Sequence, residues 1–218
     1  MEIREIYPGV YKSKNKLFTE PLINESVYGE KLVKINGKTL REWLPRRSKL
    51  GAAIVNGLKE FPIKKDSLVL YLGAASGTTI SHVSDITRNG MVYGVEFSPI
   101  VGRQLLSLAE KRFNLVPIIS DASLPESYES LVPIVDVIFQ DIAQRHQVEI
   151  LVRNAKKFLK RNGYAMIAVK ARSIDVASKP TMVFREVRSQ LEESFEILQE
   201  LRLEPWEKDH AFFLLLFS

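Results

Sequence analysis

Short apolar runs alternate with segments of helical periodicity from Ser67 onward, and this pattern constrains the fold more than any other feature. The runs cover residues 67–73, 91–97, 115–121, 135–142 and 164–171. Between them, apolar residues recur three or four positions apart, as Val101, Leu105 and Leu108 do. Apolar strands separated by helices are typical of a parallel sheet covered on both faces, so we expect an α/β fold.

The two ends of the chain depart from this alternation. The runs 195–203 and 210–218 follow each other without a helix, which predicts a terminal hairpin and one antiparallel strand in a sheet of seven. Near the start, KLVKINGKTLREW alternates around Asn-Gly, the strongest short hairpin signal. We therefore expect a small antiparallel β domain over residues 1–45 and an α/β domain over residues 46–218.

Capping residues indicate where the helices begin. Ser48 and Ser98 stand at N-cap positions, Ser98 with a proline directly after it, and a third helix is expected from about Thr78. Two further helices are predicted over 146–161 and about 181–195. The first of these ends in basic residues, which favour a helix C-terminus.

The absence of cysteine excludes several kinds of chemistry. Disulfides, cysteine-zinc sites, iron–sulfur clusters and cysteine nucleophiles are all impossible. The three histidines show no metal-ligand spacing, so we expect no metal. No apolar run reaches the roughly 18 residues of a membrane helix. The charged start, MEIREIYPGVYKSKNK, lacks the apolar core of a signal peptide, so we expect a cytoplasmic protein.

The net charge of +5 leaves two interpretations open. Basic residues cluster at 12–16, 41–49 and 156–161. Such clusters favour a polyanionic partner, usually a nucleic acid, but they also occur on a solvated basic surface. Charge alone does not decide between them.

The stretch YLGAASGTTISH, residues 71–82, joins a predicted strand to a predicted helix through a glycine turn. No lysine follows Gly77, which disfavours a triphosphate-binding P-loop. The spacing Gly73-x-x-x-Gly77 also differs from the G-x-G-x-x-G of dinucleotide sites. S-adenosylmethionine carries no phosphate and needs a bare turn against which adenosine and methionine can press. This cofactor is therefore the third and favoured candidate.

Acidic residues follow the next two predicted strands. Glu96 stands where a carboxylate can accept both ribose hydroxyls, and Asp121 can accept from the adenine amino group. Phe97 can pack on the adenine ring. The plainer interpretation is that Glu96 and Asp121 only cap the helices that follow. A glycine turn, a glutamate and an aspartate on three consecutive strand ends favour the cofactor site.

The fourth and fifth predicted strands end in Asp141 and Lys170, which should meet because neighbouring parallel strands end at the same edge. Lys49 and His210 complete a lysine–aspartate–lysine–histidine set. A ribose 2′-hydroxyl must lose its proton as it attacks a sulfonium methyl, and a basic side chain there would assist. The alternative is that Asp141 and Lys170 form a structural ion pair.

Several motifs together resemble the fibrillarin family in its short archaeal form. They are REWLPRRSKLGAAI, YLGAASGTTISHVSDI, VYGVEFSP, the Asp121-Ala122 pair, FQDIAQ, VKARSIDV and EKDHAFF. The glycine–arginine-rich tail of eukaryotic members is absent, which fits an archaeal protein. Two departures stand out. Arg145-His146 follows FQDIAQ where the family often has Pro-Asn, and Ile100 stands where it often has arginine.

The resemblance implies a Rossmann-like class I methyltransferase fold and guide-directed 2′-O-methylation of rRNA and tRNA. It implies the catalytic set Lys49, Asp141, Lys170 and His210. It also implies cofactor contacts, which together with the glycine turn comprise Gly73, Ala75, Thr78, Thr79, Glu96, Phe97, Asp121, Ala122, Asp141, Ile142, Ala143 and Gln144. The implied partners are a Nop-domain scaffold protein, a kink-turn-binding ribosomal-type protein and a box C/D guide RNA.

Two other functions stay open at this point. One is a non-catalytic RNA-binding or assembly subunit with a vestigial pocket. The other is a methyltransferase for a base or small molecule. Carbon-5 pyrimidine methylation through a cysteine adduct is impossible here, and no Asn- or Asp-Pro-Pro-aromatic signature of nitrogen methylation is present.

Overall fold

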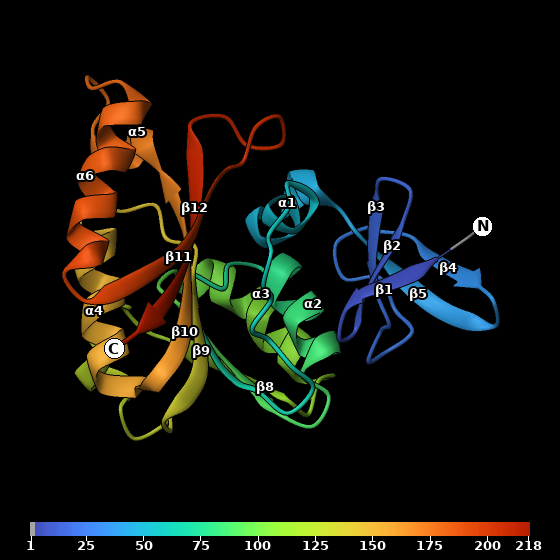
Figure 1. Ribbon diagram of the computed structural model, residues 1–218. Coiled ribbons are helices and arrows are strands. Elements are labelled where there is room, and N and C mark those ends of the chain that lie inside the picture. The colour runs from blue at the N-terminus through green and yellow to red at the C-terminus, as the bar shows by residue number, and fades with distance from the viewer. Residues whose placement is uncertain (1–2) are drawn as a thin grey trace.

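The computed structural model describes residues 3–218 and contains two β-sheets (Figure 1). The smaller sheet has five strands in the order β1-β2-β3-β5-β4, all antiparallel. Its strands are β1 Arg4–Tyr7, β2 Val10–Ser13, β3 Lys16–Thr19, β4 Leu32–Ile35 and β5 Lys38–Trp43. Asn36 and Gly37 have φ values of 52° and 81°, as a two-residue hairpin turn requires, which confirms the predicted hairpin. The division at residue 45 remains a proposal.

The larger sheet has seven strands in the order β11-β12-β10-β9-β6-β7-β8. Only β12 runs antiparallel to its neighbours, as expected for the terminal hairpin. The strands are β6 Leu68–Leu72, β7 Met91–Glu96, β8 Leu115–Ile119, β9 Val135–Gln140, β10 Leu159–Lys170, β11 Phe195–Arg202 and β12 His210–Phe217.

Helices cover both faces of this sheet (Figure 1). On the side of the smaller sheet lie α1 Lys49–Val55, α2 Thr78–Ile86 and α3 Pro99–Ala109. The opposite face is covered by α4 Gln147–Phe158 and α6 Pro180–Glu192. Short helical turns complete the chain: η1 Pro45–Arg47, η2 Pro125–Tyr128 and α5 Ala171–Ile174. No helix within residues 3–218 is long and apolar enough to cross a membrane.

The predicted helix starts are confirmed, but the predicted helix end at residue 161 is wrong, and the helix predicted over 48–61 ends at Val55. The Ser48 and Ser98 hydroxyls accept hydrogen bonds from the backbone N–H of Gly51 and Val101, at 3.1 and 3.3 Å. The helix expected over 146–161 ends at Phe158. Leu159 is already extended and pairs with Val135, because its buried side chain enters the core there.

A buried polar network joins the smaller sheet to α2. The Asp85 carboxylate accepts from Arg41 at 2.8 Å and from Arg112 at 2.9 Å, and all three side chains are almost fully buried. Glu30 pairs with Arg41 from the other side at 2.8 Å. These charges are tolerated inside because each guanidinium faces a carboxylate. The network therefore holds the two sheets together through specific pairs.

His82 lies within this network, fully buried and stacked on Trp43 with ring centroids 4.7 Å apart. Its Nδ1 and Nε2 lie 2.8 Å from the hydroxyls of Thr19 and Tyr28. The Thr19 hydroxyl donates to Asp85, so Nδ1–H donates to Thr19. Burial beside two guanidinium groups favours the neutral ring.

Stability should therefore fall as the pH drops below about 6.5. Burial, and secondly the charges of Arg41 and Arg112, hold the pKa of His82 well below its ordinary value. Between the lowered pKa of His82 in the folded protein and its ordinary pKa of about 6.5 in the unfolded chain, only the unfolded chain binds the proton. The free energy of unfolding therefore falls by up to about 1.4 kcal/mol per pH unit. Urea unfolding at pH 7 and pH 5 checks this. In His82→Gln the loss between these pH values should be smaller by about 2 kcal/mol, and an identical loss would contradict the prediction.

Candidate active site

The glycine turn lies at the point where the strand order of the larger sheet reverses. β6 pairs with β7 on one side and β9 on the other, and ligands of such sheets bind at the carboxyl ends of these strands. Gly73 has a φ of 83°, and a Cβ there would stand 2.4 Å from the carbonyl oxygen of Asp141. A Cβ at Gly77 would stand 2.5 Å from Leu108. The turn therefore requires glycine at both positions and keeps a bare backbone at the crevice.

Glu96 holds this turn in place. Its carboxylate accepts from the backbone N–H of Ala75 at 2.9 Å and from that of Ser98 at 2.8 Å. A carboxylate has about four acceptor positions, so two hydroxyls can still be accepted. Phe97 follows directly and is 66% exposed, leaving a ring face open to stacking. The roles of Ala75 and Ser98 in holding Glu96 had no signal in the sequence, because backbone donors carry no residue type.

Asp121 lies after the end of β8, next in line from Glu96. Its Oδ1 accepts from the backbone N–H of Ser123 at 2.8 Å, which leaves Oδ2 for a ligand. Ala122 is buried, and its carbonyl accepts from Asn154 at 2.8 Å. Asp121 thus does cap its own loop, as the plainer interpretation held, while retaining an acceptor.

The N-terminus of α2 faces the turn with two threonines. The Thr79 hydroxyl is buried and donates to Ser48 at 3.0 Å, so it ties α2 to α1 and is not free for a ligand. The first backbone N–H groups of a helix lack partners within it, so the amides of Thr78 and Thr79 remain suitable for a carboxylate.

Asp141 pairs with Lys49, which corrects the expected contact with Lys170. The Lys49 Nζ lies 3.0 and 3.1 Å from the two carboxylate oxygens, and both side chains are about three-quarters buried. The register explains the difference: Gln140 is opposite Ile167, so Lys170 lies two residues beyond the level of Asp141. That offset is about 7 Å along the strand.

Lys170 is instead opposite His210 in the antiparallel pair of β10 and β12. Residues directly opposite have their side chains on the same face of the sheet, about 5 Å apart at Cβ. The Lys170 side chain is exposed and makes no hydrogen bond or ion pair within residues 3–218. His210 is buried, with Nδ1 2.7 Å from the carbonyl of Lys208, which leaves Nε2 free.

The segment after β9 and one residue beneath it complete the crevice. Ile142 packs on the core, Ala143 and Gln144 are exposed, and the Gln144 carbonyl accepts from Gln147 at 3.0 Å. Tyr71 lies fully buried below. Burial, and secondly the Asp141 carboxylate, raise the pKa of Tyr71 well above its ordinary value, so the phenol stays protonated. Sequence reasoning missed this residue.

The predicted site residues therefore gather along one edge of the larger sheet. Acceptors and a bare turn lie over β6, β7 and β8, and two amines and an imidazole lie over β9, β10 and β12. No cluster of three metal-ligating side chains occurs within residues 3–218. The arrangement suits a ligand with hydroxyls and an amino group on one side, and proton transfer from a hydroxyl on the other.

Comparison with known proteins gives one consistent result. The family model "Fibrillarin" matches residues 1–218. The "Fibrillarin-like rRNA/tRNA 2'-O-methyltransferase" of Thermococcus onnurineus is 56% identical over 216 residues, covering 96% of each chain.

Solved structures agree in fold. The fibrillarin of Aeropyrum pernix, described as a complex with natively bound S-adenosyl-L-methionine, superposes with a TM-score of 0.87 at 44% identity. It covers 95% of this chain and 94% of that one. A fibrillarin/Nop5p complex superposes with a TM-score of 0.92 at 43% identity, covering 99% of this chain and all of the other.

Proposed function

Because the chain belongs to the fibrillarin family, we infer that it is an S-adenosylmethionine-dependent methyltransferase of RNA ribose. We propose that a guide RNA directs it to 2′-hydroxyls in rRNA and tRNA, as the catalytic subunit of a box C/D ribonucleoprotein. The observation that carries the proposal is that Glu96, Asp141 and Lys170 all stand at strand ends on one edge of the larger sheet, around the glycine turn. A vestigial pocket in a purely structural subunit would not need all three.

The donors and acceptors of the crevice suit the groups of the cofactor. Glu96 would accept the two ribose hydroxyls, Asp121 would accept from the adenine amino group, and Phe97 would cover the adenine ring. The amides of Thr78 and Thr79 hold the methionine carboxylate. Glycine at position 73 lets the turn pack closely against the backbone of Asp141, which brings the ends of β6 and β9 together beside the crevice. The segment from Asp141 to Gln144 would add further cofactor contacts from the end of β9.

When bound, S-adenosylmethionine supplies a methyl group activated on sulfonium sulfur. Lys170 lies at the substrate side. There its amine would accept the proton that leaves the 2′-hydroxyl, or its ammonium would stabilise the developing alkoxide, as the oxygen–methyl bond forms and the sulfur–methyl bond breaks. The pair of Lys49 and Asp141 would position the hydroxyl for attack, and His210 would support Lys170 from the facing strand.

Partners complete the proposed assembly. The superposition on a fibrillarin/Nop5p complex supports a Nop-domain scaffold protein as one partner. We extend the proposal to a kink-turn-binding ribosomal-type protein, a box C/D guide RNA and rRNA and tRNA substrates. The place of action is the cytoplasm.

Saturating S-adenosylmethionine should raise the melting temperature, because a ligand that binds only the folded state adds about 2.7 kcal/mol at 100 times its Kd. In Glu96→Gln the affinity should fall about tenfold to hundredfold, since a charge-assisted hydrogen bond contributes about 1.5–3 kcal/mol. Thermal unfolding measures the first effect and calorimetric titration the second. Glu110→Gln, an exposed position at the C-terminal end of α3, is the matched control. Equal affinities in the two variants would rule out the assigned role of Glu96.

Single-turnover transfer of labelled methyl to assembled guide–target RNA tests the activity itself. Nucleoside analysis of the product should place the label on ribose. Label on a base would favour the base methyltransferase, and no transfer by a complex that assembles correctly would favour the non-catalytic subunit.

A further inference from the structure

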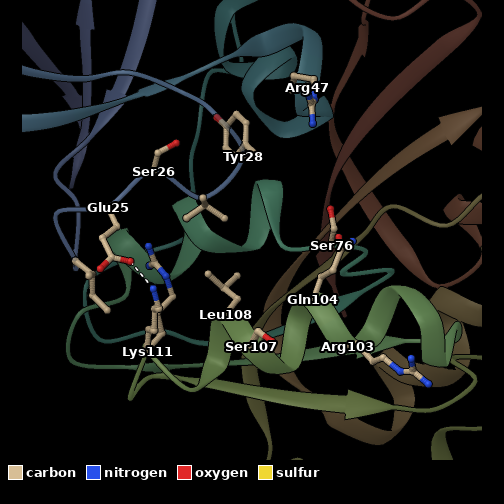
Figure 2. Close-up of a pocket in the computed structure, with 13 residues that line it drawn as sticks. Glu25, Ser26, Tyr28, Arg47, Ser76, Arg103, Gln104, Ser107, Leu108 and Lys111 are labelled. Carbon is tan, nitrogen blue, oxygen red and sulfur yellow. Dashed lines mark hydrogen bonds and ion pairs between the residues drawn. The ribbon is translucent and has the colours of Figure 1, made fainter.

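A polar cleft of about 620 Å³ lies between the smaller sheet and α3, outside the crevice described above (Figure 2). The β3–β4 loop, residues 23–28, forms one wall, and α3 forms the other. We call it the junction cleft. Its lining includes the polar side chains of Tyr28, Arg47, Ser76, Arg103, Gln104 and Ser107.

Two of the cations that line the junction cleft lack a carboxylate partner. Lys111 pairs with Glu25 at 2.6 Å, and the buried Arg112 pairs with Asp85. Arg47 and Arg103 are exposed and form no ion pair within residues 3–218. The Arg47 guanidinium lies over the Tyr28 ring, 5.6 Å from its centroid, and this contact orients it. The cleft therefore carries two uncompensated positive charges, one on each side.

Neutral hydrogen-bonding groups lie between these charges. Figure 2 shows Gln104 and Ser107 along α3, with Ser76 nearby on the glycine turn. None of these three side chains makes a hydrogen bond within residues 3–218. Guanidinium forks with hydroxyl and amide groups are what proteins use to hold phosphate and ribose.

The junction cleft begins in the two segments that also build the candidate active site. Ser76 belongs to the glycine turn, and Arg47 precedes Lys49 by two residues with Ser48 extended between them. The Cα atoms of Arg47 and Lys49 are therefore at most about 7 Å apart. A single RNA strand can thus reach both residues.

We propose that the junction cleft binds the phosphodiester backbone of the RNA strand whose ribose enters the candidate active site. The proposal rests on the proposed function and adds a subsite to it. Arg47 and Arg103 contact phosphate oxygens, and Ser76, Gln104 and Ser107 donate to phosphate or ribose. Because these groups recognise backbone, the contact is independent of base sequence. A guide RNA can then choose the target while this cleft positions the strand.

The test is the double variant Arg47→Gln/Arg103→Gln, with Arg185→Gln on the opposite face as the matched control. Binding of a single-stranded RNA of about twelve nucleotides is measured against salt concentration at saturating S-adenosylmethionine. The slope of log K against log salt should lose about 1.4, because each single-strand phosphate contact contributes about 0.7. Affinity at low salt should fall at least about tenfold. In the assembled complex, KM for substrate RNA should rise while cofactor affinity stays unchanged.

A slope equal to that of the control would overturn the proposal. A loss of S-adenosylmethionine affinity in the double variant would also overturn it, because the cleft would then bind the methionine part of the cofactor. A loss of scaffold-protein binding alone would overturn it too, because the cleft would then be a protein-binding surface. Ser107→Glu places a carboxylate in the cleft from an exposed helix position and should weaken RNA binding with the fold intact. If the wild-type complex transferred no methyl, the proposed function would fail, and the salt slopes would still decide the cleft.

Discussion

Replacing Lys170 by alanine is expected to slow methyl transfer by a factor of about 10²–10⁴ while cofactor affinity is unchanged. Lys170 ends β10 beside His210, and its amine makes no hydrogen bond or ion pair within residues 3–218. It is therefore the free basic group at the substrate side, since Lys49 is held by Asp141. Single-turnover transfer in the assembled complex, with calorimetric titration of S-adenosylmethionine, measures the two quantities.

Two comparison variants sharpen this result. Lys179→Ala removes an exposed lysine outside the crevice and should leave transfer unchanged. Lys170→Arg keeps the positive charge but cannot accept a proton, because an arginine stays protonated. Slow transfer in Lys170→Arg would assign proton acceptance to the lysine, whereas partial rescue would assign electrostatic stabilisation. Near-normal turnover in Lys170→Ala would remove the residue from the mechanism.

Replacing Asp85 by alanine is expected to lower the free energy of unfolding by about 3–5 kcal/mol. The change removes the carboxylate that Arg41 and Arg112 share and leaves both guanidinium groups buried. Arg41 retains Glu30, but Arg112 has no other carboxylate partner within residues 3–218. For a chain of this size the melting temperature should fall by about 10 °C. Thermal and urea unfolding measure the loss.

An exposed ion pair provides the control for Asp85. Glu126 lies 3.3 Å from Arg153 with both side chains well exposed, so Glu126→Gln should cost less than about 1 kcal/mol. If Asp85→Ala and Glu126→Gln lost similar stability, the buried network would not be what joins the smaller sheet to α2.

Features that depend on neighbours in the sequence were predicted well. The strands, the caps at Ser48 and Ser98 and the Asn36-Gly37 turn follow from local backbone preferences and from apolar periodicity. The end of α4 was not predicted, because the basic residues after Phe158 suited a helix C-terminus. There the burial of Leu159 in the core outweighs local preference.

The amino-acid sequence by itself determined which residues stand at strand ends, and hence which side chains reach the carboxyl edge of the sheet. Only the tertiary structure decided how they pair. The register of β9 and β10 separates Asp141 from Lys170 and gives the carboxylate to Lys49. The Asp85 network and the junction cleft likewise arise where the β3–β4 loop and η1 meet α2 and α3. Such contacts join residues far apart in the chain, so no local pattern encodes them.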